Sequence, residues 1–115
     1  MAGAARLSNP MHVTGASVAT RRTGVGVFDN ILFTFESPAA LFRVLSPKRW
    51  DLLERLQSLG PSSLRGLARS LERDVKRVHE DVAALIEVGL IEKTEHGQIH
   101  VPFEVIEADF ELRAA

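Results

Sequence analysis

Hydrophobic residues in the central part of the chain recur at helical spacing in three successive segments. From Pro47 to Leu59 the leucines fall on one face. The segment that starts at Leu64 has apolar residues at the i, i+3, i+4 and i+7 positions. In the segment from Val75 to Val88 the predicted inward residues are Val75, Val78, Val82, Leu85 and Ile86. The pattern therefore predicts three amphipathic helices.

Residues typical of helix ends flank each of these segments. Ser46 precedes Pro47, and a serine followed by proline favours the first turn of a helix because the hydroxyl caps a backbone N–H and proline lacks one. Ser63 and Asp74 can cap the second and third helices in the same way. The Gly60-Pro61 pair and Gly89 end the first and third helices.

Alternating and β-prone runs lie on both sides of the helices. Residues 90–94 and 98–101 predict a hairpin around the turn Glu95-His96-Gly97. Ile31 to Phe35 predict a strand, and Ser37-Pro38 start a short helix that reaches about Leu45. In the ambiguous stretch 103–113 we expect one helical turn and then a strand, residues 108–112, paired with Ile31–Phe35.

The order helix, helix, turn, helix, hairpin predicts an α+β fold, a winged helix-turn-helix with flanking N- and C-terminal strands. We assign residues 46–101 to this DNA-binding domain, and residues 27–45 and 102–115 to dimerisation. Residues 1–26 are rich in Gly, Ala, Ser and Thr and lack acids, so we interpret them as disordered. A transit peptide and a start at Met11 are alternatives for this stretch.

Composition narrows the class of protein. The 115 residues include 45% hydrophobic and 25% charged residues, which suits one globular domain. The absence of cysteine excludes disulfides and thiolate chemistry and favours a reducing, cytoplasmic setting. No apolar run approaches the roughly 20 residues that span a bilayer, so we expect no membrane partner.

Charge is distributed unevenly along the chain although the net charge is -1. Residues 43–77 hold 9 basic and 4 acidic residues, whereas residues 78–115 hold 2 basic and 9 acidic ones. A basic middle with an acidic end directs one face towards phosphate. Double-stranded DNA is therefore the expected partner of the central segment.

The outward residues of the predicted third helix carry the expected base contacts. Arg77 suits a guanine and Glu80 a cytosine amine, while His79 can approach either bases or phosphate. Arg73 and Lys76, near the start of this helix, suit phosphates. The expected backbone and wing contacts are Ser63, Arg65, Arg69, Lys93, Thr94, His96 and Gln98.

The segment SLRGLARSLERDVKRVHEDVAALIEVGLIEKTEHGQIHV resembles winged-helix regulators of the broad MarR and ArsR-like group. The residues on which this resemblance rests are Leu67-Ala68, the apolar positions from Val78 to Ile91 and the wing glycine Gly97. The phrase LFRVLSPKRWDLLERL and the ending 103–113 look more like small prokaryotic predicted regulators, some thought to be antitoxins. The resemblance implies a dimeric repressor with a cognate toxin as a further partner. Gly66 and Glu72 depart from the usual pattern, since a helix former and a turn glycine are common at these positions.

Three other interpretations are open at this stage. A winged helix can serve as an adaptor for protein partners without binding DNA. His79, His96 and His100 with Glu80 could form a metal-sensing site, but no histidine pair has i, i+4 spacing on one helix, so we expect no metal or cofactor. We expect no enzymatic activity, because the sequence offers no nucleophile–base pair and no phosphate-binding glycine loop.

Overall fold

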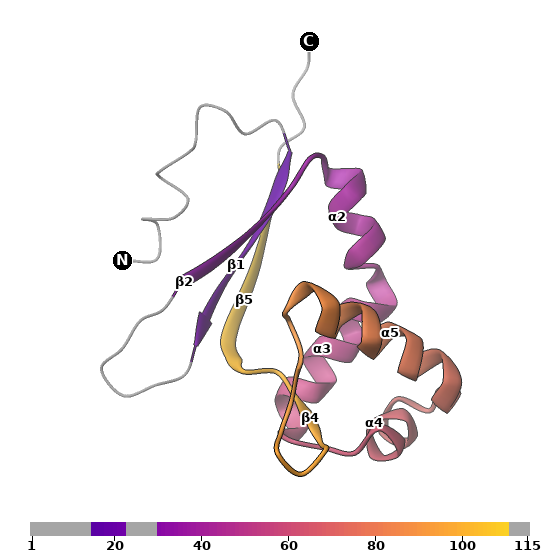
Figure 1. The fold of residues 1–115 in the computed structure, drawn as a ribbon. Helices are drawn as coiled ribbons and strands as arrows, with labels where there is room; N and C mark the ends of the chain where they lie inside the picture. The colour runs from indigo at the N-terminus through magenta and orange to yellow at the C-terminus, as the bar shows by residue number, and fades with distance from the viewer. Residues whose placement is uncertain (1–14, 23–29, 111–115) are drawn as a thin grey trace. The chain divides into compact units, whose positions relative to one another are not determined.

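The computed structural model describes residues 15–22 and 30–110, which form four helices and five strands (Figure 1). The described residues fall into two units. The first consists of residues 15–22, 30–43 and 103–110, and the second of residues 44–102. The fold class is α+β, as the sequence predicts. No helix in the described ranges is both long and apolar enough to cross a membrane.

The first unit is built on a three-stranded antiparallel sheet. Its strands are β1 (Ala16–Arg22), β2 (Asn30–Phe35) and β5 (Phe103–Phe110), in the order β2-β1-β5. After β2 the chain forms α2 (Pro38–Val44), whose first turn is capped where Ala40 N donates to Ser37 Oγ at 3.1 Å. The predicted short helix is thus confirmed, with its Ser-Pro start.

The register of the sheet collects apolar side chains on one face. In β1, Ala16, Val18 and Thr20 are buried and alternate with half-buried residues. Because directly paired residues of antiparallel strands point to the same side, the cross-strand partners share this face. The partners are Phe35, Phe33 and Ile31 in β2 and Phe110, Ala108 and Ile106 in β5.

A register shift in β5 keeps this face apolar to its end. Val105 pairs with Arg21 and Phe103 with Arg22, so that Glu104 is the extra residue of a bulge. Without the bulge, Glu104 would occupy the position opposite Arg22. The shift places Phe103 there instead, and the Phe103 side chain is buried.

The structure corrects three expectations for this unit. Residues 16–22 are not disordered but form the central strand, while residues 1–14 and 23–26 lie outside the described residues. The strand at residues 31–35 does not pair with the C-terminal strand, because β1 lies between them. Phe103 begins a strand and not a helical turn, since β5 pairs with β1 from Phe103 to Phe110. Residues 111 and 112 of the expected strand lie outside the description.

The second unit contains the three predicted amphipathic helices. They are α3 (Pro47–Leu59), α4 (Leu64–Leu71) and α5 (Val75–Val88). Ser46, Ser63 and Asp74 cap them by accepting from Arg49 N, Gly66 N and Arg77 N. Gly60 follows α3, and Gly89 ends α5 with a left-handed φ of 94°. The core of this unit is formed by Leu45, Leu52, Leu53, Leu56, Leu67, Ala68, Val78, Val82, Leu85, Leu90, Ile91 and Ile99.

The turn between α4 and α5 is short and contains a non-glycine residue in the left-handed region. Glu72 has a φ of 54° and a ψ of 45°, and its N–H donates to the carbonyls of Ala68 and Arg69. A turn glycine is common at this position in the winged-helix regulators that the segment resembles. The chain therefore reverses in the expected place at a conformational cost of roughly 1–2 kcal/mol.

The predicted hairpin is present but shorter than expected. Its strands are β3 (Glu92–Lys93) and β4 (Ile99–His100). Leu90 and Ile91 are not part of it, because their N–H groups donate back to the Leu85 carbonyl at the end of α5. On its other side β4 bridges Ser62, with the Ser62 N to Ile99 O distance at 2.9 Å and the reverse bond at 2.8 Å. The hairpin is thereby tied to the residue that precedes the cap of α4.

Candidate nucleic-acid interface

The exposed face of α5 carries four of the five residues expected to recognise DNA. Lys76, Arg77, His79 and Glu80 are all exposed. They lie opposite the apolar stripe of Val78, Val82 and Leu85, which is fully buried. This separation follows from the 3.6-residue period, because residues that bury one side of a helix leave the intervening ones to solvent. Two of the four are cationic and lie in the first turn of α5.

The basic residues of α4 and the residues of the hairpin are also at the surface. Arg65 and Arg69 are exposed on α4. The Ser63 hydroxyl caps this helix by accepting a hydrogen bond from Gly66 N at 3.0 Å. In the hairpin, Lys93, His96 and Gln98 are exposed. These side chains are available to a ligand of this unit, while the Ser63 hydroxyl is already engaged.

Thr94 has a structural role within the hairpin. Its hydroxyl accepts from His96 N at 3.3 Å and from Gln98 N at 3.1 Å. The turn closes through Thr94 N to Gln98 O at 2.8 Å, and Gly97 supplies a φ of 80°. The threonine therefore shapes the turn from inside, and its hydroxyl is less available to DNA than the sequence suggested.

Arg73 is the expected recognition residue that the structure places differently. Its Nη2 lies 2.7 Å from Asp81 Oδ2, and Arg49 Nε lies 3.0 Å from Asp81 Oδ1. We call this group of Arg49, Arg73 and Asp81 the arginine clasp. It joins α3, the turn before α5 and α5 itself. Arg73 thus attaches the turn before α5 to Asp81 within α5.

Both arginines of the clasp are only partly exposed. The side chains of Arg49, Arg73 and Asp81 are 23%, 20% and 16% exposed, respectively. Arg49 also donates through Nη1 to the Val44 carbonyl at 3.1 Å. Burial of the Asp81 carboxyl would by itself raise its pKa. The hydrogen bonds from Arg73 and Arg49, together with their charges, outweigh that effect and hold the pKa of Asp81 below its ordinary 3.8.

Sequence reasoning missed Asp81 and Arg49 as members of this site. The available signal was the position of Asp81, which follows the buried Val78 by three residues and precedes the buried Leu85 by four. A carboxylate at the border of an apolar stripe needs a cationic partner. The identity of the partner was not readable, because Arg49 lies 32 positions away in sequence.

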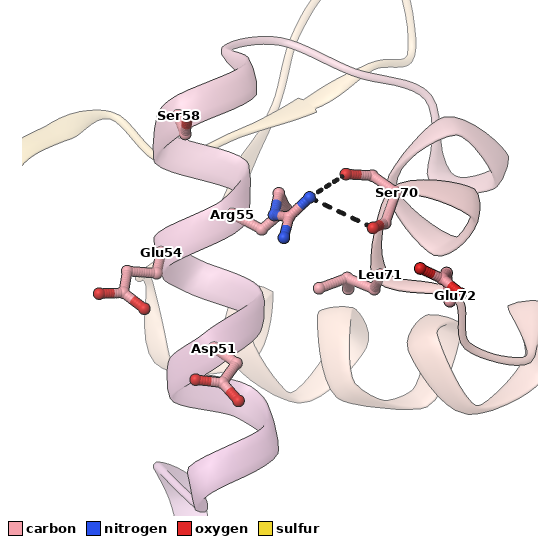
Figure 2. A pocket seen from close by; sticks show the side chains of 7 residues that line it. All are labelled: Asp51, Glu54, Arg55, Ser58, Ser70, Leu71 and Glu72. Atoms are coloured by element: carbon pink, nitrogen blue, oxygen red, sulfur yellow. Dashed lines mark hydrogen bonds between the residues drawn. The ribbon is translucent and has the colours of Figure 1, made fainter.

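One pocket of the second unit lies between α3 and the end of α4 (Figure 2). It has a volume of about 440 Å³ and is lined by Asp51, Glu54, Arg55, Ser58, Ser70, Leu71 and Glu72. Arg55 Nη1 donates to Ser70 Oγ at 2.9 Å and to the Ser70 carbonyl at 3.2 Å. These bonds attach α3 to the end of α4, which steadies the turn before α5.

The histidines do not form a metal site in the part of the chain that the structure describes. No three His, Cys, Asp or Glu side chains gather there in a way that could hold an ion. His100 faces its cross-strand neighbour Glu92, with Nε2 and Oε1 4.0 Å apart. His79 and His96 are exposed on different elements.

The second unit is a three-helix domain that ends in a small hairpin, with an exposed, partly cationic face on its third helix. The chain belongs to the HVO_A0114 family, whose model matches residues 44–108. The match covers the whole second unit and the first part of β5. This family designation specifies no activity. Comparison with curated proteins gives no match.

Proposed function

We propose that this protein is a sequence-specific, DNA-binding transcriptional regulator whose second unit is a winged helix-turn-helix. In this proposal α4 braces α5, α5 enters the major groove, and the β3–β4 hairpin is the wing. The observation that carries the proposal is the exposed face of α5. It presents Lys76, Arg77, His79 and Glu80 on the second helix of a tightly turned pair.

The bond between β4 and Ser62 supports the assignment of the wing. A hairpin fixed to the chain just before α4 keeps a constant relation to the helix pair, as a wing needs if it is to follow a groove. Lys93 is exposed at the end of β3 and suits a phosphate. His96 and Gln98 lie in and beside the turn, where they suit the backbone or the minor groove.

Different residues take different parts in the proposed complex. Arg77 donates to guanine, Glu80 accepts from a cytosine amine, and His79 contacts bases or phosphate. Lys76 from α5 and Arg65 and Arg69 from α4 bind phosphates, which fixes the protein on the duplex without reading sequence. We assign Arg73 to the arginine clasp, which sets the orientation of α5.

The proposal extends to the assembly and setting of the protein. We infer a homodimer, because operators read by such domains are commonly two-fold and because, among the described residues, β2 and β5 are the outer strands of the sheet. A MarR- or ArsR-like repressor in the cytoplasm, without catalytic activity, is the biological role we propose. A cognate toxin is the protein partner that an antitoxin role would add.

A protein-binding adaptor is the second candidate, and a specific observation favours it. Phe42 of α2 and Phe110 of β5 are 49% and 52% exposed and contact each other edge to face, with ring centroids 5.1 Å apart. Paired exposed aromatics are typical of surfaces that bind proteins. The exposed surface of α5 also carries the acidic residues Glu80 and Glu87, which are compatible with a protein partner.

Binding to random-sequence duplex DNA at several salt concentrations separates the two candidates. Each phosphate neutralised by Lys or Arg releases condensed counterions, so the logarithm of the association constant should fall linearly with the logarithm of salt. Four to six such contacts from each bound protomer predict that each protomer contributes about -4 to -5 to the slope. An affinity that is absent or independent of salt would leave the adaptor as the better account.

A further inference from the structure

The sheet of the first unit ends in two strands of different character. β2 and β5 are its outer strands, and an outer strand has N–H and C=O groups on alternate residues that point away from the sheet. Among the described residues, no strand pairs with the outer side of β2. Natural proteins usually protect such an edge with charge, proline or a bulge.

Only one of the two edges has that protection. β5 carries Glu104, Glu107 and Asp109 and is interrupted by the bulge at Glu104. β2 has the sequence NILFTF, with four apolar residues and no charge, proline or register shift. An uncharged, regular strand edge tolerates a second copy of itself beside it, whereas a strand with three carboxylates repels its own copy.

We propose that β2 pairs antiparallel with β2 of a second copy of this chain, which joins two three-stranded sheets into one of six strands. The inference rests on the dimer in the proposed function and names its interface. A two-fold antiparallel contact uses the same edge on both copies and so closes on itself. Pairing of β2 with the β5 edge of another copy would leave free edges and build open chains.

The sequence of β2 suits one symmetric register in particular. If the two-fold axis passes through Phe33, Phe33 lies opposite its own copy, and Ile31 lies opposite Phe35 in both directions. All of these side chains belong to the apolar face already defined by the pairing with β1. Aromatic–aromatic and aromatic–β-branched pairs stabilise antiparallel strands, so this register extends the apolar face across the dimer.

Cross-linking at the axis tests the register directly, because the chain contains no cysteine. In Phe33→Cys the two introduced thiols would face each other, at a Cα separation of about 4.5–5.5 Å that a disulfide can bridge. We expect mild oxidation to convert most of the full-length variant to a covalent dimer. Val105→Cys, on exposed β5, is the matched control and should remain uncross-linked.

Charge placed on the edge provides a second test that does not depend on the packing of Phe33. Thr34 is exposed, so Thr34→Lys should leave the monomer folded by circular dichroism. By light scattering we expect it to raise the dimer dissociation constant about tenfold or more, since an edge lysine blocks strand addition. Val105→Lys on the other edge should leave the dissociation constant unchanged. Should Phe33→Cys fail to fold, the result for Thr34→Lys decides alone.

Two results would overturn the proposal. One is a wild-type chain that stays monomeric at a protein concentration of roughly 100 μM, where even a weak dimer would form. The other is a dimer that survives Thr34→Lys but dissociates in Phe110→Ser, which would place the interface at the exposed aromatic pair. DNA titrations of the same samples keep the claims apart. A monomer that binds DNA refutes this interface and the homodimer but leaves the proposed DNA binding intact, and a β2-linked dimer that does not bind DNA refutes only the proposed DNA binding.

Discussion

Removal of the negative charge of Asp81 tests the role of the arginine clasp in holding α5. In Asp81→Asn the side chain keeps its shape and one acceptor oxygen, but Arg49 and Arg73 lose their shared counter-charge. The Arg49 guanidinium also donates to the Val44 carbonyl, and both guanidinium groups are only partly exposed. The variant therefore leaves two partly desolvated cations close together without the group that compensates them.

The exposure of the clasp sets the size of the expected effect. Exposed ion pairs contribute less than about 1 kcal/mol, and removing one partner of a fully buried pair costs about 3–5 kcal/mol. The three side chains are 16–23% exposed, which lies between these limits but nearer the buried one. We expect Asp81→Asn to lower the free energy of unfolding by about 2 kcal/mol at pH 7.

The lowered pKa of Asp81 gives this effect a pH dependence with a definite sign. A carboxyl whose pKa is lower in the folded than in the unfolded chain stabilises the fold fully above the unfolded value. That contribution disappears as the pH falls through the lower, folded value. The stability difference between wild type and Asp81→Asn should therefore be constant above about pH 5 and shrink below the ordinary 3.8.

Urea unfolding followed by circular dichroism, from pH 2 to pH 7, measures both quantities. Glu87→Gln is the matched control, because Glu87 is exposed on the same helix and its charge change should alter stability by less than 0.5 kcal/mol, roughly the range for surface substitutions. Two results would contradict the clasp as a stabilising unit. One is a loss of unfolding free energy in Asp81→Asn smaller than roughly 0.5 kcal/mol. The other is a stability difference between wild type and Asp81→Asn that is the same at pH 2 as at pH 7.

Two further predictions concern backbone positions. Gly15→Ala should destabilise the first unit by about 1–3 kcal/mol, because a Cβ there would clash with the carbonyl oxygens of Phe35 and Glu36. Thermal unfolding of this variant, compared with that of the control Ser17→Ala, checks this expectation. An unchanged midpoint would contradict the described β1–β2 pairing. Glu72→Gly should raise stability by up to about 1 kcal/mol, because glycine relieves the left-handed strain but gains freedom in the unfolded chain. Glu72→Ala keeps the Cβ and should gain nothing, so equal stabilisation by both variants would argue against strain at this turn.

The helices were predictable because their signals are local. The Ser46-Pro47 start and the Gly60 end gave α3 its observed bounds, and Asp74 and Gly89 did the same for α5. Each of these residues acts on backbone groups within a few positions of itself. The exposed face of α5 follows from the 3.6-residue period of its apolar residues. Four of the proposed recognition residues could therefore be predicted from the sequence.

The sheet and the clasp depend on contacts between distant residues and were therefore not predictable. β1 combines small and polar residues, ASVATRR, which is also the composition of a flexible segment. Only its two neighbouring strands show that Ala16, Val18 and Thr20 line a buried face. Arg73 was likewise interpreted as a phosphate ligand because its charge was visible and its partner Asp81 was not.

The most direct measurement of the central claim compares Arg77→Ala with Lys93→Ala in binding to a duplex selected from a random pool and to its scrambled version. If α5 reads the major groove, Arg77→Ala should cost about 1–3 kcal/mol on the selected duplex and leave scrambled DNA nearly unaffected. Lys93→Ala, like Arg69→Ala, should weaken both duplexes alike and make the salt slope shallower by about one unit for each bound protomer. If Arg77→Ala instead weakens both duplexes equally in folded protein, α5 is not the reading element and the proposed function is wrong in its main feature.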